Sequence, residues 1–207
     1  MVKPNEVTQG SDEWFALRLG KVTASKISDV MSKGVGRERY QEALLAERLT
    51  GQAGSSFTNA SMQWGTEQEP FARQAYEIDH GFVEETGFWQ HDELALGVSP
   101  DGLVGEDGVV GDHGLVEIKC PNSSTHVSWL RDKKVPSKHI KQIQCQLWVT
   151  GRAWCDFVSF DPRMTLLKNR LMVVRCERDD VLIKKMEEEV KRFLNELDQL
   201  YKSIGEQ

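Results

Sequence analysis

The sequence predicts a single α/β domain in which helices come first, strands dominate the centre and a long helix closes the chain. Its 207 residues, 39% hydrophobic and 28% charged, have the size and composition of one folded domain. Helical patterns fill the first part, β-rich runs separated by glycine turns fill the middle, and neither a repeat nor a linker divides them. We therefore expect one domain over 1–207, with a helical front over 11–81, a core with a central mixed sheet flanked by helices over 82–176, and a C-terminal helix over 179–204.

The helical front begins with capping signals. Ser11 and the two acidic residues after it begin a short helix that Gly20 ends, because acidic side chains favour the first turn of a helix. Thr23 and Ser25 offer hydroxyls that can cap a second helix through residue 31. The rest of this part is predicted as a basic, glycine-rich loop over 33–37, a helix over 38–50, a polar connection over 52–59 and a longer helix over 60–80.

The pattern changes after Gly81, where short runs typical of strands appear. The predicted strands cover residues 82–86, 87–90, 94–98, 115–120, 153–160 and 171–176. Glycine-rich turns over 105–108 and 111–114 separate the third strand from the fourth. Helices over 124–132 and 137–150 lie between strands, and the last helix carries an apolar stripe of helical period. Strands that alternate with helices indicate a sheet with helices packed on it.

Charge is distributed unevenly along the chain. A net charge of −6 and a pI near 5.5 argue against general coating of nucleic acid. Carboxylates dominate residues 67–107, whereas lysine and arginine dominate 18–39 and 131–141. An acidic centre between basic flanks suits a metal-dependent enzyme that acts on phosphates. Chance produces the same pattern, however, so charge alone decides nothing.

Cysteine usage and hydropathy predict a cytoplasmic protein with no membrane span. Four cysteines without a close pair are typical of reduced thiols, no apolar run reaches the roughly 18 residues of a span, and no signal-peptide pattern opens the sequence. The cysteine spacing disfavours an iron–sulfur cluster, and the five histidines show no metal-ligand spacing. We expect the histidines at the surface or in packing contacts, and most of the six tryptophans in the core.

One stretch combines the residue types of a metal-dependent hydrolase. Asp101 lies in a Ser-Pro-Asp-Gly turn, and sixteen residues later a predicted strand holds Glu117 and Lys119. Successive strand residues face opposite sides, so Glu117 and Lys119 share one face while Val116 and Ile118 pack on the other. If the two segments pair, two carboxylates, an amine and the Ile118 carbonyl converge, which suits Mg²⁺ and an attacking water. The alternative is an ordinary surface turn beside a half-exposed strand, since Pro-Asp-Gly is common in turns.

Further blocks of sequence accompany this stretch, in order, from about residue 10 to residue 165. They are Trp14-Phe15-Ala16-Leu17-Arg18-Leu19-Gly20, Val22-Thr23-Ala24-Ser25, Trp64-Gly65 followed by Glu69, Ser99-Pro100-Asp101-Gly102, Glu117-Ile118-Lys119-Cys120-Pro121, Gln142-Ile143-Gln144 before Trp148-Val149-Thr150, and Asp161-Pro162-Arg163-Met164. Together they resemble the family of lambda-type alkaline exonucleases and YqaJ-type viral recombinases, within the PD-(D/E)xK nuclease superfamily. The resemblance implies a restriction-endonuclease-like core with a helical N-terminal part.

The resemblance also implies the roles of the residues in the catalytic centre. Asp101, Glu117 and the carbonyl of Ile118 would hold Mg²⁺, with two ions expected per site and Mn²⁺ as a substitute. Lys119 would position the attacking water. Glu69 would add a carboxylate and Gln142 would support the site from the helix behind it, although each alone would be interpreted as a solvated polar residue.

A second group of residues would bind the DNA end. The resemblance implies that Arg18, Ser25 and Ser99 form a pocket for the terminal 5′-phosphate, which suits the fork of donors on arginine and the anion preference of a helix start. Taken singly, Arg18 and Ser25 would be interpreted as a helix-surface residue and an ordinary cap. Met62 would take the position of a wedge that separates terminal base pairs, where a core residue is the alternative. The loop over 33–37 is shorter than expected for the family, so no DNA contact is assigned there.

The resemblance implies a Mg²⁺-dependent 5′-to-3′ exonuclease of a phage or prophage. It would degrade one strand of linear double-stranded DNA with a 5′-phosphate end to mononucleotides, leaving 3′ overhangs for recombination. It further implies a ring-shaped homotrimer and a single-strand annealing protein as partner. Two alternatives stay open: a structure- or sequence-specific endonuclease on the same fold, and a catalytically silent module that binds DNA ends, against which the intact Asp101, Glu117 and Lys119 count.

Overall fold

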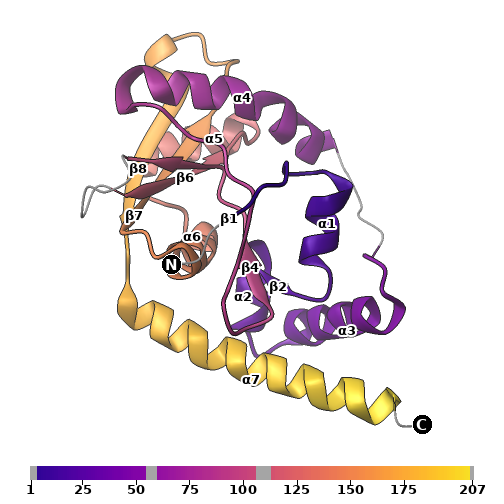
Figure 1. The fold of residues 1–207 in the computed structure, drawn as a ribbon. Helices are drawn as coiled ribbons and strands as arrows, with labels where there is room; N and C mark the ends of the chain where they lie inside the picture. Colours follow the sequence, from indigo (N-terminus) through magenta and orange to yellow (C-terminus); the bar gives the residue numbers. More distant parts are fainter. Residues whose placement is uncertain (1–3, 55–59, 106–112, 206–207) are drawn as a thin grey trace.

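The computed structural model describes residues 4–54, 60–105 and 113–205. Their strands form two four-stranded sheets (Figure 1). The first has the order β1-β3-β4-β2, formed by β1 (Pro4–Asn5), β3 (Phe88–Gln90), β4 (Leu96–Val98) and β2 (Val22–Thr23). The second has the order β5-β6-β7-β8, formed by β5 (Gly102–Val104), β6 (Gly114–Lys119), β7 (Trp154–Phe160) and β8 (Leu171–Glu177). The pairs β2–β4 and β6–β7 are parallel and the others antiparallel.

The predicted α/β class is confirmed, but two mixed sheets replace the single central sheet that we expected. The interruption falls between β4 and β5, at Ser99-Pro100-Asp101. Pro100 has no N–H to donate to a strand ladder, so pairing stops there and the chain passes from one sheet to the other. The junction between the two sheets therefore places Asp101 at a strand end, outside the hydrogen-bonded ladder.

The helices of the described residues begin and end close to the predicted positions. They are α1 (Asp12–Arg18), α2 (Ile27–Val30), α3 (Val35–Thr50), α4 (Ala60–His80), α5 (Ser123–Asp132), α6 (Ser137–Thr150) and α7 (Asp180–Gly205), with 3₁₀ turns at Ala24–Lys26 and Leu167–Asn169. Local chemistry explains several ends. The Ser11 hydroxyl accepts a hydrogen bond from the N–H of Trp14 at 3.2 Å, and Gly51 ends α3 with a positive φ of 67°.

Helices cover both faces of the second sheet (Figure 1). On one face Val116 and Ile118 pack with Tyr76 of α4. On the other face Leu115 and Phe157 pack in a cluster that includes Ile143 of α6. The alternation predicted for β6 is thus observed. The apolar stripe of α7 closes the core against α3 and α6, with Met186, Val190, Phe193 and Leu197 fully buried.

Two expectations about secondary structure were wrong, and three short strands were not predicted. Residues 82–86 form no strand but one isolated bridge between Glu84 and Leu103, because the N–H of Val83 instead donates to the Glu77 side chain at 2.9 Å. Helix α3 begins at Val35 rather than at residue 38. The carbonyl of Gly34 accepts a hydrogen bond from the Arg37 N–H, which starts the helix earlier and shortens the loop before it. The strands β1, β2 and β5 were not predicted, because two or three residues carry too little pattern to indicate a strand.

Several remaining expectations concern single residue types. The turns expected over 106–112 and the part of the polar connection over 55–59 lie outside the described residues. All four cysteines are free thiols, two of them buried and two half-buried. Trp89, Trp129 and Trp154 are buried as expected, whereas the other three tryptophans are only partly buried. Among the described helices, none is long and apolar enough to cross a membrane.

Candidate active site

The junction between the two sheets brings Asp101 next to the middle of β6. Gly102, the first residue of β5, pairs with Val116, so the antiparallel register brings Asp101 opposite Glu117 and next to Ile118. A carboxylate oxygen of Asp101 accepts a hydrogen bond from the Ile118 N–H at 2.6 Å. Gly102 is required here, since a Cβ at this position would lie 2.1 Å from a methyl group of Val83. The short strand β5 therefore sets where Asp101 meets β6.

Glu117 points to the opposite side of β6 from Val116 and Ile118, and it is almost completely buried, with 1% of its surface exposed. Its Oε1 accepts a hydrogen bond from Gln142 at 2.6 Å, and its Oε2 accepts one from Gln146, also at 2.6 Å. Both glutamines lie on α6, four residues apart and hence on one face of that helix. A buried carboxylate with a donor on each oxygen is held in one orientation.

Lys119 shares the face of Glu117, as the strand period predicted. Its ammonium pairs with Glu117 Oε1 and also donates to the Ile118 carbonyl at 3.2 Å. Burial alone would lower the pKa of Lys119, but the carboxylates of Glu117 and Asp101 outweigh burial and raise the pKa above its usual value. Lys119 is therefore an ammonium ion at neutral and moderately alkaline pH.

Glu69 of α4 belongs to the same electrostatic cluster. Its carboxylate pairs with Arg73 at 3.2 Å, and Arg73 also pairs with Glu85. Burial raises the pKa of Glu69 above its usual value, although Arg73 and Lys119 oppose the shift. The pKa of Asp101 is raised well above its usual value by burial first and by the charge of Glu117 second. Carboxylates that raise one another's pKa form a site that favours a cation.

The residues of this cluster offer oxygen donors of the kind that Mg²⁺ binds. Within residues 4–54, 60–105 and 113–205, no three carboxylate, histidine or cysteine side chains form a ready-made metal cage. Mg²⁺ needs no such cage, because it commonly binds one or two carboxylates and completes its shell with water and substrate phosphate. Asp101, Glu117 and the Ile118 carbonyl offer oxygen donors, and the pKa of Asp101 is raised first by burial and then by the charge of Glu117. The donor set therefore fits Mg²⁺.

A cleft of about 660 Å³ opens beside this cluster. Its lining includes Asp101, Glu69, Arg73 and Trp14, together with the N-terminal segment over 6–10. The side chain of Gln9 in that segment donates to the Pro100 carbonyl at 2.8 Å, so the segment is fixed against the turn that carries Asp101. The acidic residues thus face a space large enough for a nucleotide.

The residues expected to bind the 5′-phosphate lie along one chain of contacts, with one exception. The Arg18 guanidinium stacks 3.9 Å from the centre of the Trp14 ring, and the indole N–H of Trp14 donates to the Ser99 hydroxyl at 2.9 Å. Trp14 lines the cleft, which links Arg18 and Ser99 to it. Burial lowers the pKa of Arg18 from its usual high value. We expected most tryptophans in the core, and Trp14 is one that instead lines the cleft.

Ser25 differs from the expectation in its local structure. It is exposed, and its hydroxyl lies 3.4 Å from that of Thr23. It belongs to a three-residue 3₁₀ turn in which Thr23 makes no side-chain cap, so the predicted hydroxyl cap is wrong. A three-residue turn has a much smaller dipole than a long helix, so its N-terminus attracts an anion only weakly. Only the hydroxyl itself is left to contact a phosphate.

Met62 lies in the first turn of α4, and 54% of its surface is exposed. The alternative that assigned this methionine to the core is therefore wrong. Met62 is therefore an exposed apolar residue near the start of this helix.

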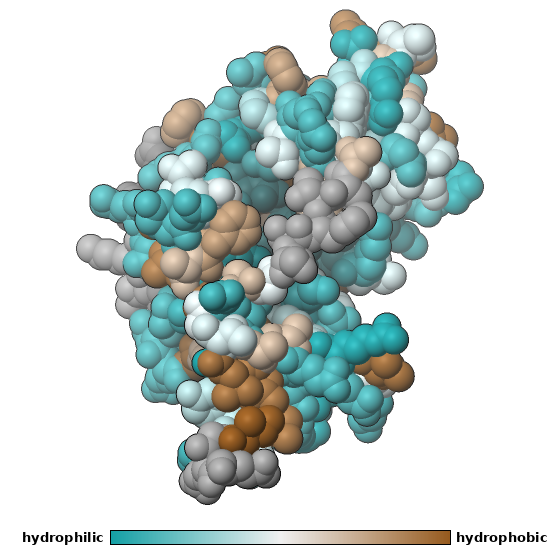
Figure 2. Space-filling model, turned by 90° about the vertical axis from the view of Figure 1, so that its right-hand side faces the viewer, coloured by the Kyte–Doolittle hydropathy of each residue, from teal (hydrophilic) through white to brown (hydrophobic). Residues whose placement is uncertain are grey.

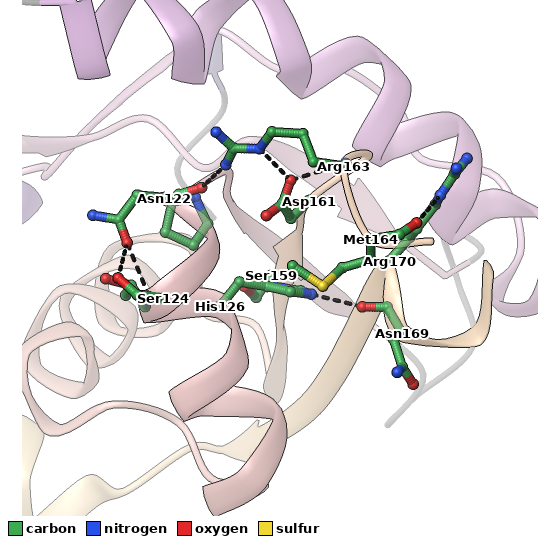
Figure 3. Close-up of polar contacts among 11 residues, drawn as sticks. Asn122, Ser124, His126, Ser159, Asp161, Arg163, Met164, Asn169 and Arg170 are labelled. Carbon is green, nitrogen blue, oxygen red and sulfur yellow. Dashed lines mark hydrogen bonds and ion pairs between the residues drawn. The ribbon is translucent and has the colours of Figure 1, made fainter. Parts of the chain in front are cut away.

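Behind the end of β6, a network of polar contacts connects the elements that carry the site. Arg163 donates to the buried Asp161 at 2.7 Å and to the Pro121 carbonyl at 3.0 Å (Figure 3). The guanidinium also stacks 4.6 Å from the Trp64 ring of α4. Arg163 thus joins the ends of β6 and β7 to α4. Next to it the fully buried His126 contacts the Ser159 hydroxyl at 2.7 Å and the Asn169 carbonyl at 2.8 Å (Figure 3).

Sequence reasoning missed three residues that contact the predicted site. Gln146 binds Glu117, Arg73 binds Glu69, and Arg163 supports the strand end after Lys119. The four-residue spacing of Gln142 and Gln146 was a usable signal, since it puts both amides on one face of a helix. Arg73 was visible only as the one base in an acidic stretch. Arg163 belongs to the block Asp161-Pro162-Arg163-Met164 that carries the resemblance, but its contacts depend on tertiary structure and were not predicted.

An aspartate at a strand end beside a Glu-x-Lys strand, with helices on both faces, is the arrangement of the PD-(D/E)xK class of nucleases. The comparison with protein families gives the narrower assignment: residues 13–153 match the YqaJ-like viral recombinase domain. The chain belongs to this family. Comparison with curated proteins yields no match.

Solved structures agree with the family. The alkaline exonuclease LHK-Exo from Laribacter hongkongensis is 45% identical, with a TM-score of 0.87 over 95% of this chain and 97% of that one. LHK-Exo in complex with dAMP is 46% identical, with a TM-score of 0.86 over 94% of this chain and 96% of that one. A phage-related exonuclease from Haemophilus somnus 129PT, 18% identical, has a TM-score of 0.69 over 89% and 96% of the two chains and shares the fold. The family and these neighbours support a nuclease role with DNA as substrate.

Proposed function

We propose that the protein is a Mg²⁺-dependent exonuclease that degrades the 5′-ended strand of linear double-stranded DNA to mononucleotides. Its 3′ single-stranded overhangs would serve phage recombination by strand annealing. The observation that carries this proposal is that carboxylates of the candidate site line a cleft that is connected through Trp14 to two of the residues expected to bind the 5′-phosphate. Asp101 and Glu69 line it directly, and Trp14 links it to Arg18 and Ser99. A hydrolytic centre near an arginine that would bind the 5′-phosphate suits an enzyme that selects the bond to be cut by its distance from a phosphorylated end.

The reaction is an in-line displacement at phosphorus. Water attacks the second phosphate, the bond to the 3′ oxygen of the terminal nucleotide breaks, and that oxygen takes up a proton. The released product is a 5′-mononucleotide, and the shortened strand carries a new 5′-phosphate. Each cut therefore creates the end that Arg18 and Ser99 would hold for the next one, which suits repeated digestion from the same end.

The residues of the centre have separate roles in this proposal. Asp101, Glu117 and the Ile118 carbonyl would hold Mg²⁺, with Glu69 directed at the same region. When bound, the ion would stabilise negative charge on the phosphate and on the leaving oxygen. Because its pKa is raised, Lys119 carries its proton and would orient the attacking water as a hydrogen-bond donor rather than act as a base. Gln142 would keep Glu117 in place.

A related enzyme supports the choice of product. LHK-Exo has been solved in complex with dAMP, a deoxynucleoside 5′-monophosphate. A product of this kind is what cleavage from a 5′ end releases. We therefore propose that the cleft of this chain accepts the terminal nucleotide with its 5′-phosphate toward Arg18.

We also propose that the protein works as a ring-shaped homotrimer with a single-strand annealing partner inside a bacterial host cell. Apolar side chains gather at the lower end of the molecule, where α3 and α7 end (Figure 2). The exposed residues there include Leu49, Leu200, Tyr201 and Ile204. An apolar surface of this kind supports contact between copies. Light scattering should give the mass of three chains, and Leu200→Glu with Ile204→Glu should reduce it; a monomeric wild-type protein would contradict the ring.

The central experiment follows each strand of a duplex separately. Linear duplex DNA is labelled on one strand at a time, with a 5′-phosphate or a 5′-hydroxyl, and digested with Mg²⁺ beside closed circular DNA. We expect loss of the 5′-ended strands only, faster with the phosphate, release of mononucleotides, and an intact circle. Cleavage of the circle would replace the exonuclease with an endonuclease on the same centre, and loss of the 3′-ended strand would reverse the proposed polarity.

A further inference from the structure

Gln146 contacts Glu117 and does not line the cleft. Gln142 and Gln146 donate to different oxygens of this carboxylate, each at 2.6 Å. The last torsion angle of a glutamate side chain is broad and weakly restrained by itself. A donor on Oε1 alone would leave the carboxylate free to turn about that contact. The second donor on Oε2 removes this freedom, and Gln146 provides it.

The surroundings of Gln146 do not explain an amide at this position by packing. Gln146 is 1% exposed, and its neighbours Ile143 and Leu147 on α6 are fully buried and apolar. The carbonyl oxygen of the Gln146 side chain is buried and has no hydrogen-bond partner in the described part of the chain. A buried polar atom without a partner weakens a fold. An apolar side chain would avoid that cost, so the use of this amide must lie in its one bond, to Glu117.

Gln144 provides the contrast on the same helix. It is 2% exposed, and both ends of its amide are paired. Its nitrogen donates to the Glu177 carbonyl at 2.7 Å, and its oxygen accepts from the Asp179 N–H at 2.8 Å. These bonds tie α6 to the segment before α7 and do not touch the site. Gln144 is thus a structural glutamine of matching burial.

We propose that Gln146 is a positioning residue that holds the Glu117 carboxylate in the orientation in which it binds the divalent metal. This inference rests on the proposed function, because it gives Glu117 the metal. Gln146 acts through Glu117 and touches neither the cleft nor the substrate. Hydrogen-bond partners behind a metal ligand commonly change metal affinity 10- to 100-fold when they are removed.

The test measures metal binding without DNA and without turnover. Gln146→Met keeps the length of the side chain and removes the donor, and Gln144→Met is the matched control. Isothermal titration with Ca²⁺ should show a roughly 10- to 100-fold weaker affinity for Gln146→Met. Gln144→Met should bind Ca²⁺ as the wild type does, although its thermal unfolding temperature should fall. In Mg²⁺-dependent digestion, Gln146→Met should shift the half-saturating Mg²⁺ concentration more than the rate at saturating Mg²⁺.

A double-mutant cycle shows whether the effect passes through Glu117. Glu117→Gln weakens metal binding by itself, and adding Gln146→Met should then cause no further loss. If Gln146→Met does not fold, Gln146→Asn keeps the amide but is one methylene too short to reach Glu117, and the same loss of affinity is expected. Circular dichroism confirms the fold of each variant before titration.

The outcomes separate this inference from the proposed function. Wild-type affinity for Ca²⁺ in folded Gln146→Met or Gln146→Asn would overturn the positioning role while leaving the exonuclease proposal intact. An equal further loss in the Glu117→Gln background would also overturn it, because the effect would not pass through Glu117. A wild-type protein that binds no divalent ion and degrades no DNA would instead overturn the proposed function.

Discussion

Lys119→Met tests whether the amine of the candidate site acts in the chemical step. In the structure this ammonium pairs with the buried Glu117 and donates to the Ile118 carbonyl at 3.2 Å, so its position is fixed before substrate arrives. A positioned group that handles a proton or an attacking water contributes about 10²- to 10⁴-fold to a rate, or roughly 2.7–5.5 kcal/mol. We expect a loss of this size in the rate at saturating Mg²⁺, with binding of Mg²⁺ and DNA retained.

The same substitution has a smaller effect on stability. A hydrogen bond to a charged group contributes about 1.5–3 kcal/mol, and Gln142 and Gln146 still hold Glu117 in the variant. For a chain of this length we expect a fall in Tm of about 3–12 °C. The pKa of Lys119 is raised, so its favourable interaction is complete below the usual lysine pKa and is lost only as pH rises through the higher folded value. The difference in Tm should therefore be constant between pH 6 and pH 9.

The assay compares single-turnover digestion of 5′-phosphorylated duplex by wild type, Lys119→Met and Lys191→Met. Lys191 is an exposed residue of α7 that pairs with Glu187 at 2.5 Å, and its substitution should leave both rate and Tm unchanged. A Lys119→Met enzyme that turns over within a few fold of the wild type would remove Lys119 from the mechanism. A stability difference that disappears between pH 6 and pH 9 would refute the assignment of its charge.

The other predictions concern the acid, the DNA end and the support behind the site. Asp101→Asn should abolish activity yet raise Tm in EDTA, because burial and neighbouring carboxylates raise the pKa of Asp101 and its ionised form costs stability. The gain in Tm should grow as pH rises from about 4, and a lower Tm would contradict the reasoning. Arg18→Ala should slow digestion of 5′-phosphorylated ends more than of 5′-hydroxyl ends; equal slowing would give Arg18 another role. Met62→Ala should slow blunt duplexes more than duplexes with unpaired 5′ ends, and a uniform effect would exclude a wedge. Arg163→Leu should cost about 1–3 kcal/mol in thermal unfolding by removing bonds to Asp161 and Pro121, and an unchanged Tm would exclude this support.

The core of the candidate site was visible in the sequence because strand geometry is strict. A period of two places Glu117 and Lys119 on one face, whichever sheet they belong to. The sequence did not show that the segment of Asp101 pairs with that strand; the predicted site depended on this assumption. It depends on β5, a three-residue strand whose position is set by Gly102 and its close approach to Val83.

Helices were predicted better than strands for a related reason. Long segments such as α4 and α7 carry an apolar period and end signals within their own sequence. The strands β1 and β2 have two residues each and exist only because β3 and β4 lie beside them. Likewise, the composition of residues 82–86 indicated a strand, but a helix side chain, Glu77, accepts a hydrogen bond from one of its backbone N–H groups. Tertiary contacts decided these cases.

The roles of single polar residues were the least visible. A tryptophan is usually expected in the core. Only the structure shows that Trp14 lines the cleft and contacts Arg18 and Ser99. Arg163 is far from the motif in sequence, yet it holds the chain just after Lys119 through the Pro121 carbonyl. A sequence pattern records which residue types are present, whereas a site depends on which of them share a partner.

The arrangement of donors around the carboxylates explains how a site without a ready-made cage can still suit a metal. The protein fixes one oxygen of Asp101 through the Ile118 N–H and both oxygens of Glu117 through α6. These bonds set the orientation of the carboxylates. The pKa of Asp101 and that of Glu69 stay raised, first because both groups are buried and also because of the charge of Glu117. The remaining negative charge is an electrostatic cost of the fold that a divalent cation would relieve. Because Mg²⁺ accepts water and phosphate oxygens as ligands, water would complete its shell in the free protein, and phosphate oxygens would replace some of that water when DNA enters the cleft.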